Sequence, residues 1–412
     1  MAPTQILDGI RVVDMTQYLS GPTVTRLLAE QGADIVKVER APHGDPTRTL
    51  AFHKNGRSGY FVQQNRGKRS LCIDFDDPAG RHVLDELIGR ADVLVENYGP
   101  GVMERRGLDW ATLRATHPRL VVASISGFGK GSGEQTGIKA PGPLSHKTAF
   151  DLIAQAYSGL LYLTGSPDDV PMPVGTSYAD VMSGVHAVAG IGLALFHRER
   201  TGEGQHIDIA MVDALFHAHE LSVQGASISG GRWNAKRMGP RSTLTSPHGV
   251  FPTGDGHVVL HVMQAQWPGF CRAIDRADLI ADERFADLSD RHRHRDELNA
   301  IIEAWTSARS SDAALAAWEA ERVPCAPVLA PHEAIDHPYF TARGMVRLVD
   351  DPVIGPLHIP GNPLRMSAQP EEPVLTAPTL GEHNGAILRE LGIDDDRIAA
   401  MEAAGVLASG PT

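Results

Sequence analysis

At 412 residues, with 42% hydrophobic and 21% charged side chains, the chain is long enough for two globular domains with a large core. The formal net charge of -12 argues against a nucleic-acid surface, because phosphate binding needs concentrated Lys and Arg. Cys72, Cys271 and Cys325 form no CxxC pair, which excludes a recognisable zinc knot or disulfide framework and favours a reducing cytoplasm. Residues 1–8 lack a signal-peptide pattern, and the longest apolar run, Val181 to Phe196, predicts a buried helix and no membrane span.

The first 126 residues alternate between strand-like and helix-like segments. Short apolar, β-branched runs predict strands, and segments with helical spacing predict helices. The expected strands are Ile10 to Met15, Asp34 to Glu39, Ser70 to Asp74, Asp92 to Glu96 and Leu120 to Ser126, and the expected helices are Thr23 to Gln31, Pro78 to Arg90 and Leu108 to Ala115. This alternation predicts an α/β protein with a parallel, doubly wound sheet.

The remainder of the chain is more varied. Gly127 to Lys147 predicts a long functional loop, and the loosened tract Gly225 to Gly239 predicts a domain boundary. A small α+β domain is expected after that boundary. The further segments are a helix at Thr148 to Tyr157, a strand at Gln205 to Met211, a helix at Val212 to Val223, a hairpin at His248 to Met263, helices through Trp318, an extended stretch at His332 to Pro378, and helices at Asn384 to Leu391 and Asp396 to Ala404.

Asp180 is a lone carboxylate that ends a turn. Pro171 and Pro173 stiffen this turn and Gly175 loosens it, so we expect the helix to start at Asp180. A carboxylate there is either an N-cap or, beside the free backbone N–H groups, a nucleophile or base whose oxyanion those donors hold. The sequence pattern leaves both interpretations open.

The sequence contains incomplete motifs of two other enzyme classes. Glu39 ends the second expected strand, where a nicotinamide-binding acid would lie, but Thr16 to Pro22 has one Gly where the dinucleotide fingerprint needs three. Ser177 resembles the nucleophile of a G-x-S-x-G elbow, but Ala179 replaces the last Gly, and prolines occupy the place of the preceding strand. Both classes are disfavoured.

Histidine pairs and clustered cations are weaker signals. His217 with His219, and His292 with His294, lack metal-ligand partners at suitable spacing, so no metal site is expected. Basic residues are expected to meet at one edge of the sheet, where they would hold a phosphorylated cofactor or simply cover the surface. These residues are Lys37, Arg40, Arg66, Lys68, Arg69, Arg105 and Arg106.

Several ordered motifs resemble the class III CoA-transferase family, also called the CaiB/BaiF family, over nearly the whole chain. They are Leu7-Asp-Gly-Ile-Arg-Val-Val-Asp14, Gly21-Pro22, Gly32-Ala-Asp-Ile-Val-Lys-Val-Glu39, Asn65-Arg-Gly-Lys-Arg-Ser70, Val95-Glu-Asn-Tyr-Gly-Pro-Gly101, Thr201-Gly-Glu-Gly-Gln205, Asp282-Glu-Arg-Phe285 and Gly381-Glu-His383.

The resemblance implies a Rossmann-like large domain built from residues 1–224 and 331–412, a small α+β domain at 225–330, and an interlocked homodimer. It implies a CoA-transferase that uses acyl-CoA and a small carboxylic acid, with Asp180 as the catalytic residue and with no nicotinamide or metal. The residues that would contact coenzyme A are Tyr18, Leu19, Arg40, Ile73, Asn97, Tyr98, Arg105 and Lys147.

In such transferases the aspartate forms a mixed anhydride with the acyl group and then an aspartyl-CoA thioester. The family also contains α-methylacyl-CoA racemases, but Phe150 stands where their proton-relaying histidine would fall. Racemase activity and non-catalytic CoA binding remain the alternatives. Leu19 and Asp76 replace a glutamine and a lysine of formyl-CoA transferases. We expect polar and cationic residues such as Arg57, His53 or His248 to hold a second carboxylate of the acceptor.

Overall fold

The computed structural model describes residues 5–131, 133, 136–139, 142–369 and 375–410, and these form two compact units. The larger unit contains the described residues within 1–160, 174–220 and 338–412, and the smaller unit contains residues 161–173 and 221–337. The sequence placed the corresponding divisions after residues 224 and 330. Residues 161–173, which sequence order assigns to the large domain, cluster with the smaller unit.

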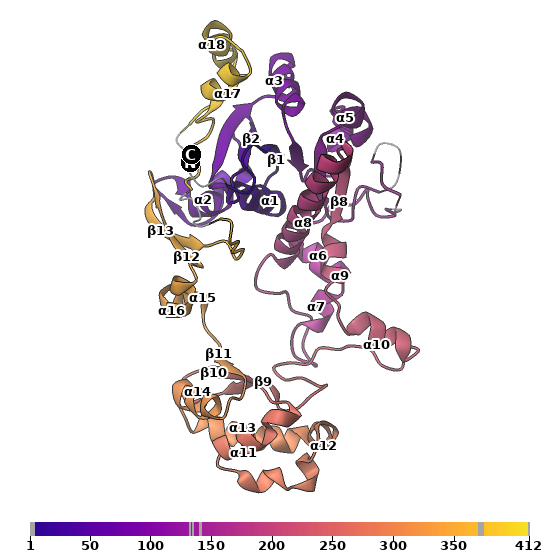
Figure 1. Ribbon diagram of the computed structural model, residues 1–412, viewed down its shortest axis with the longest axis vertical. Coiled ribbons are helices and arrows are strands. Elements are labelled where there is room, and N and C mark those ends of the chain that lie inside the picture. Colours follow the sequence, from indigo (N-terminus) through magenta and orange to yellow (C-terminus); the bar gives the residue numbers. More distant parts are fainter. Residues whose placement is uncertain (1–4, 132, 134–135, 140–141, 370–374, 411–412) are drawn as a thin grey trace. The chain divides into compact units, whose positions relative to one another are not determined.

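A parallel sheet forms the centre of the larger unit (Figure 1). It has six strands in the order β5-β2-β1-β6-β7-β8. Successive residues of these strands are buried on both faces, as the continuous apolar runs of the sequence predict. The α/β fold class is therefore confirmed. The strands are β1 (Arg11–Met15), β2 (Asp34–Arg40), β5 (Lys68–Ile73), β6 (Val93–Glu96), β7 (Val121–Ser126) and β8 (His206–Ala210).

Helices cover both faces of this sheet. One face packs its alternate residues against α1 (Ser20–Ala29), α6 (Asp151–Tyr157), α8 (Tyr178–Thr201) and α9 (Met211–Phe216). The opposite face packs against α3 (Pro78–Gly89), α4 (Val102–Arg105), α5 (Trp110–Thr116), α17 (Asn384–Glu390) and α18 (Asp395–Ala403). Because α17 and α18 supply Ile387, Leu388, Ile398 and Met401 to this core, the last part of the described chain completes a core that begins with Val13.

Helix α8 is long and apolar enough to cross a membrane by length and composition alone. In the structure, however, α8 packs against α1, and its buried residues include the small side chains of Ala179, Ser183 and Ala187 together with Gly184. A Cβ atom added to Gly184 would lie 3.0 Å from the Ser20 carbonyl oxygen, so glycine allows the two helices to approach closely. This contact holds the start of α8 beside Ser20.

The larger unit also contains segments that the sequence analysis did not predict. The stretch expected to be extended, His332 to Pro378, includes two short helices and a hairpin, because Val346–Asp351 and Gly355–Pro360 alternate around a turn. The remaining elements of this unit are β3 (His53–Lys54), β4 (Arg57–Ser58), η1 (Pro46–Thr49), α2 (Gly59–Asn65), α16 (Pro338–Ala342), β12 (Val346–Asp351) and β13 (Gly355–Pro360).

The smaller unit packs helices against a three-stranded antiparallel sheet in the order β11-β10-β9, as expected for an α+β domain. The hairpin predicted at His248 to Met263 is confirmed, but the helix predicted at Val212 to Val223 is wrong, because α9 ends at Phe216 and a separate helix begins at Ser222. Its elements are β9 (His248–Pro252), β10 (His257–His261), β11 (Cys325–Pro327), α10 (Ser222–Ile228), α11 (Trp267–Ala273), α12 (Leu288–Arg293), α13 (Arg295–Ser307), α14 (Ser311–Ala320), α15 (Pro331–Asp336), η2 (Gln264–Gln266), η3 (Ala277–Ile280) and η4 (Glu283–Phe285), while α7 (Leu160–Leu163) lies where the chain divides.

Candidate active site

A pocket of about 690 Å³ lies in the larger unit at the carboxyl ends of four strands. Its walls come from the residues that follow β1 and β6, from the end of β7, and from Met211 after β8. Strand order reverses between β1 and β6, and in open parallel sheets ligands bind at such a switch point. Asp180 and Phe150 both line this pocket.

Asp180 lies inside the first turn of α8. The helix begins at Tyr178, with Ser177 at the cap position, so the predicted helix start at Asp180 is wrong. Of the two interpretations left open for the Asp180 carboxylate, the structure contradicts the N-cap. The Ser177 side chain makes no capping hydrogen bond. The first-turn carboxylate is therefore free to face the pocket while the cap comes from elsewhere.

Asp151, the first residue of α6, caps α8 from a distance in sequence. Its Oδ1 accepts hydrogen bonds from the backbone N–H groups of Ala179 at 2.7 Å and Asp180 at 3.4 Å. Its Oδ2 accepts from Gln155 Nε2 at 2.6 Å. These bonds occupy two of the helix-terminal N–H groups that were expected to hold an oxyanion.

The carboxyl group of Asp180 resists ionisation. Burial is the largest cause, the charge of Asp151 adds to it, and hydrogen bonding from Ser20 opposes it, so that the pKa of Asp180 is raised to about 6. No cation in the described part of the chain contributes to this balance. A carboxylate that is desolvated and unpaired is a stronger nucleophile than a carboxylate in an ion pair.

Two neutral side chains that can donate hydrogen bonds line the same pocket as this carboxyl group. Burial, together with the charges of Asp180 and Asp45, raises the pKa of Tyr60 to about 12, so its phenol stays protonated and can donate. Gln17 also lines the pocket, and its side-chain amide has no hydrogen-bond partner among the residues that the structure describes. The two side chains are suited to stabilise negative charge that develops on a bound carbonyl oxygen.

Five of the residues that the resemblance assigned to coenzyme A line this pocket: Tyr18, Leu19, Asn97, Tyr98 and Lys147. The Asn97 side chain fixes the loop after β1, since its Oδ1 accepts from the Gln17 N–H at 2.9 Å and its Nδ2 donates to the Gln17 carbonyl at 2.8 Å. Tyr18 is held at a positive φ of 64°, and Phe150 packs edge-on against it with ring centroids 6.0 Å apart.

The other three assigned residues, Arg40, Ile73 and Arg105, do not line the pocket. Arg40 and Ile73 are paired neighbours at the ends of β2 and β5, and the side chain of Ile73 is buried in the core. Asp76 forms ion pairs with Arg40 at 2.9 Å and with Arg106 at 3.1 Å. Asp76 thus neutralises two of the cations that were expected to hold a phosphorylated cofactor.

Beneath the pocket lies a buried charge network that we define as Asp14, Glu39, Asp45, Lys37, Lys68 and Arg48. Its ion pairs join Lys37 to Asp45 at 2.8 Å, Lys68 to Asp14 at 3.0 Å and Arg48 to Glu39 at 2.7 Å. Lys37 also donates to the Thr16 carbonyl at 2.9 Å, and Asp45 accepts from the Tyr18 N–H at 3.4 Å. The network therefore fixes the loop that carries Tyr18.

Three of the cations expected at the sheet edge form buried ion pairs with carboxylates. These are Lys37, Lys68 and Arg66. Arg57, proposed for a second carboxylate of the acceptor, is buried and pairs with Asp351 at 2.8 Å, so that expectation is wrong. The sequence analysis missed Ser20, Tyr60 and Asp151. Of these three, Asp151 could have been predicted from the sequence, because it lies next to Phe150 in the motif compared with the racemases.

The fold and the pocket define an α/β protein with a buried carboxyl group, free of any ion pair among the described residues, at the carboxyl edge of its sheet. The match to CoA-transferase family III covers residues 7–384, so the chain belongs to this family, as the motifs predicted. It is 38% identical to a succinyl-CoA:mesaconate CoA-transferase from Haloarcula marismortui, covering 94% of this chain and 97% of the relative. It is 36% identical to a formyl-CoA:oxalate CoA-transferase from Streptomyces coelicolor, covering 97% and 99% of the two chains. A CaiB/BaiF family protein from Brucella suis has the same fold, with a TM-score of 0.81, 33% identity and coverage of 94% and 99%.

Proposed function

We propose that this class III CoA-transferase moves CoA from an acyl-CoA to a carboxylic acid through covalent intermediates on Asp180. The observation that carries the proposal is the environment of Asp180, which is desolvated, lacks a counter-ion and faces the pocket at the switch point of the sheet. The same residue would attack, become acylated and be regenerated within one cycle.

The steps balance without a metal or redox group. Asp180 attacks the thioester carbonyl, the C–S bond breaks, and the CoA thiolate leaves a mixed anhydride. The thiolate then attacks the Asp180 carbonyl carbon, releasing the donor acid and leaving an aspartyl-CoA thioester. The acceptor carboxylate repeats the two steps in reverse and departs as the new acyl-CoA. Tyr60 and Gln17 would stabilise the successive oxyanions.

The environment of Phe150 favours transfer over racemisation. A racemase needs a second group that relays a proton, whereas Phe150 offers a phenyl ring and the adjacent Asp151 is engaged by Ala179 and Gln155. Acyl-CoA incubated in deuterated water without acceptor acid should therefore gain no deuterium at its α-carbon. Label incorporated at a rate comparable to turnover would contradict the proposed transfer activity.

Hydroxylamine trapping tests the covalent intermediate. With acyl-CoA present, hydroxylamine should convert Asp180 to a hydroxamate that peptide mass spectrometry locates, and the yield should fall when acceptor acid competes. A protein that only binds CoA would give no hydroxamate at any residue. A hydroxamate at another carboxylate would assign the nucleophile elsewhere.

We also propose that the acceptor is a short dicarboxylic acid, since mesaconate and oxalate appear in the names of the relatives. Lys147 is the cation that lines the pocket in the described part of the chain, and it would hold a distal carboxylate or a CoA phosphate. A panel of acyl-CoA donors crossed with mono- and dicarboxylic acids, read by mass spectrometry, identifies the pair. Preference for monocarboxylic acids would reject this choice of acceptor.

We further propose a cytoplasmic, interlocked homodimer. Side chains on α6 and α8 are apolar and largely exposed, with Leu193 at 71% and Phe196 at 63%, and a patch of this kind is typical of a subunit interface. The free cysteines fit a reducing compartment. Light scattering after gel filtration should give twice the 44.3 kDa chain mass, and Leu193→Asp should reduce it to one chain. A monomeric wild-type protein would contradict the dimer.

A further inference from the structure

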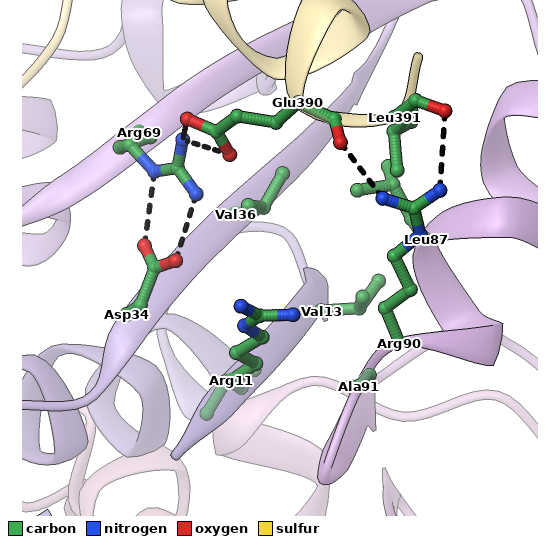
Figure 2. A pocket seen from close by; sticks show the side chains of 11 residues that line it. Arg11, Val13, Asp34, Val36, Arg69, Leu87, Arg90, Ala91, Glu390 and Leu391 are labelled. Atoms are coloured by element: carbon green, nitrogen blue, oxygen red, sulfur yellow. Dashed lines mark hydrogen bonds and ion pairs between the residues drawn. The ribbon is translucent and has the colours of Figure 1, made fainter. Parts of the chain in front are cut away.

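A second pocket, of about 270 Å³, lies at the amino-terminal edge of the same sheet. It is formed where β1 and β2 begin, at residues Arg11 and Asp34, and is closed by the ends of α3 and α17 (Figure 2). Because the strands are parallel, this edge is opposite the one that carries Asp180. The pocket is therefore separate from the candidate active site.

Both carboxylates of this second pocket are bound by one arginine. Arg69 donates from Nε and Nη2 to the two oxygens of Asp34, at 2.9 and 2.7 Å, and from Nη1 to the two oxygens of Glu390, at 2.8 and 2.9 Å (Figure 2). Arg90 donates instead to the carbonyl oxygens of Glu390 and Leu391, at 2.7 and 3.1 Å. All of these groups are satisfied within the protein.

Arg11 is the exception in this pocket. Its Cα is the direct parallel neighbour of Asp34, so an ion pair across the two strands would be expected. Arg69 occupies both oxygens of Asp34, and the guanidinium of Arg11 has no partner in the part of the chain that the structure describes (Figure 2). Arg90 forms an ion pair with Glu86 at 3.5 Å and Arg69 holds both lining carboxylates, so the exposed guanidinium of Arg11 is the positive charge left unpaired among the described lining residues.

The walls around this charge are apolar. Val13 and Val36 come from the sheet, Leu87 and Ala91 from the end of α3 and the residues after it, and Leu391 from the end of α17. A guanidinium binds a carboxylate through two parallel hydrogen bonds, and apolar walls favour an apolar body attached to it. A phosphate dianion fits less well, because Asp34 and Glu390 would repel its second charge.

We propose that this second pocket binds a small monocarboxylate with an apolar body, held by Arg11. The site does not depend on the proposed reaction of Asp180, since it shares no residue with the active-site pocket. Its ligand class overlaps with the carboxylic acids that a CoA-transferase consumes and releases. The fraction of this pocket that is occupied would follow the concentration of the acid, although the pocket is separate from Asp180.

Equilibrium dialysis of the full-length protein against radiolabelled hexanoate tests the site by stoichiometry. The wild type should bind one more hexanoate per chain than Arg11→Gln, whose affinity at this site should fall about tenfold or more. Arg397→Gln, which removes an exposed arginine of α18 outside the pocket, should bind as the wild type does. CoA exchange by Arg11→Gln should be unchanged, because Arg11 is not part of the active-site pocket.

Three results would overturn the proposal: equal hexanoate stoichiometry in the wild type and Arg11→Gln, no hexanoate bound by the wild type, or displacement by hexan-1-ol at concentrations equal to those of unlabelled hexanoate. If inorganic phosphate displaced the label more readily than unlabelled hexanoate did, the pocket would be a general anion site and the proposed carboxylate ligand would be wrong. Thermal unfolding of each variant confirms that it is folded. None of these measurements uses Asp180, so failure here leaves the proposed reaction standing.

Discussion

Buried carboxylates near the carboxyl edge of one sheet have pKa values shifted in opposite directions, although burial raises the pKa of each. Burial alone would raise the pKa of Asp14, but Lys68 and Lys37 lower it to about 2. The pKa of Glu39 is likewise lowered by Arg48, and that of Asp45 by Lys37. Asp180 has no such cation, and its pKa is raised to about 6. The difference shows that counter-ions, more than depth, separate a structural carboxylate from a reactive one here.

The sharpest test of this comparison removes the unpaired carboxylate. Asp180→Asn should lower kcat for CoA exchange by about four orders of magnitude or more, because the covalent nucleophile is lost, while the fold stays intact. Steady-state exchange rates and circular dichroism measure the two effects. Asp213→Asn is the matched control, since Asp213 also has a pKa raised by burial but lies outside the pocket. Substantial turnover by Asp180→Asn would refute the covalent mechanism.

The paired set should respond through stability. Lys37→Met leaves Asp45 buried without its 2.8 Å partner and removes the donor to Thr16, so the free energy of unfolding should fall by about 3–5 kcal/mol. Urea unfolding measures this loss. Arg389→Gln, which breaks an exposed pair with Asp395, should cost less than about 1 kcal/mol. An equal decrease in the free energy of unfolding for the two variants would show that the buried pair contributes no more to stability than the exposed pair.

Asp151 should set the pH dependence of the reaction. Asp180 must be ionised to attack, and its folded pKa is about 6, so kcat/KM should fall as the pH drops through about 6. Asp151→Asn removes the charge that helps to raise this pKa yet keeps an oxygen that can accept from Ala179. The acid limb should therefore move to lower pH by roughly half a unit to one unit. An unmoved limb would mean that burial alone raises the pKa.

The smallest expected effect concerns Asp76. Asp76→Asn frees Arg40 and Arg106 from exposed ion pairs, so the KM for acyl-CoA should fall by about two- to fivefold with kcat unchanged. Initial-rate measurements at saturating acceptor acid give both constants. A KM that stays the same or rises would place the CoA phosphates away from Arg40 and Arg106.

The sequence predicted those parts of the fold that depend on local pattern. The five strands expected before residue 127 are all present, because continuous apolar runs bounded by turns identify buried parallel strands. The turn before Asp180 and the family motif indicated this residue as a candidate site residue. The capping of α8 by Asp151 was not predictable, since the bond joins residues 28 positions apart. The fate of Arg57 was equally hidden, because its partner Asp351 lies 294 residues away.

The return of the C-terminal helices to the first core has a consequence for biosynthesis. The face of the sheet that buries Val13, Val36 and Leu71 is completed by Ile387, Leu388 and Met401. The smaller unit is synthesised in full before these residues emerge from the ribosome. A nascent chain therefore exposes apolar strands of the larger unit while the smaller unit is made, and contacts of such long sequence separation form slowly. Its yield in cells should depend on chaperones that shield that face until α17 and α18 arrive.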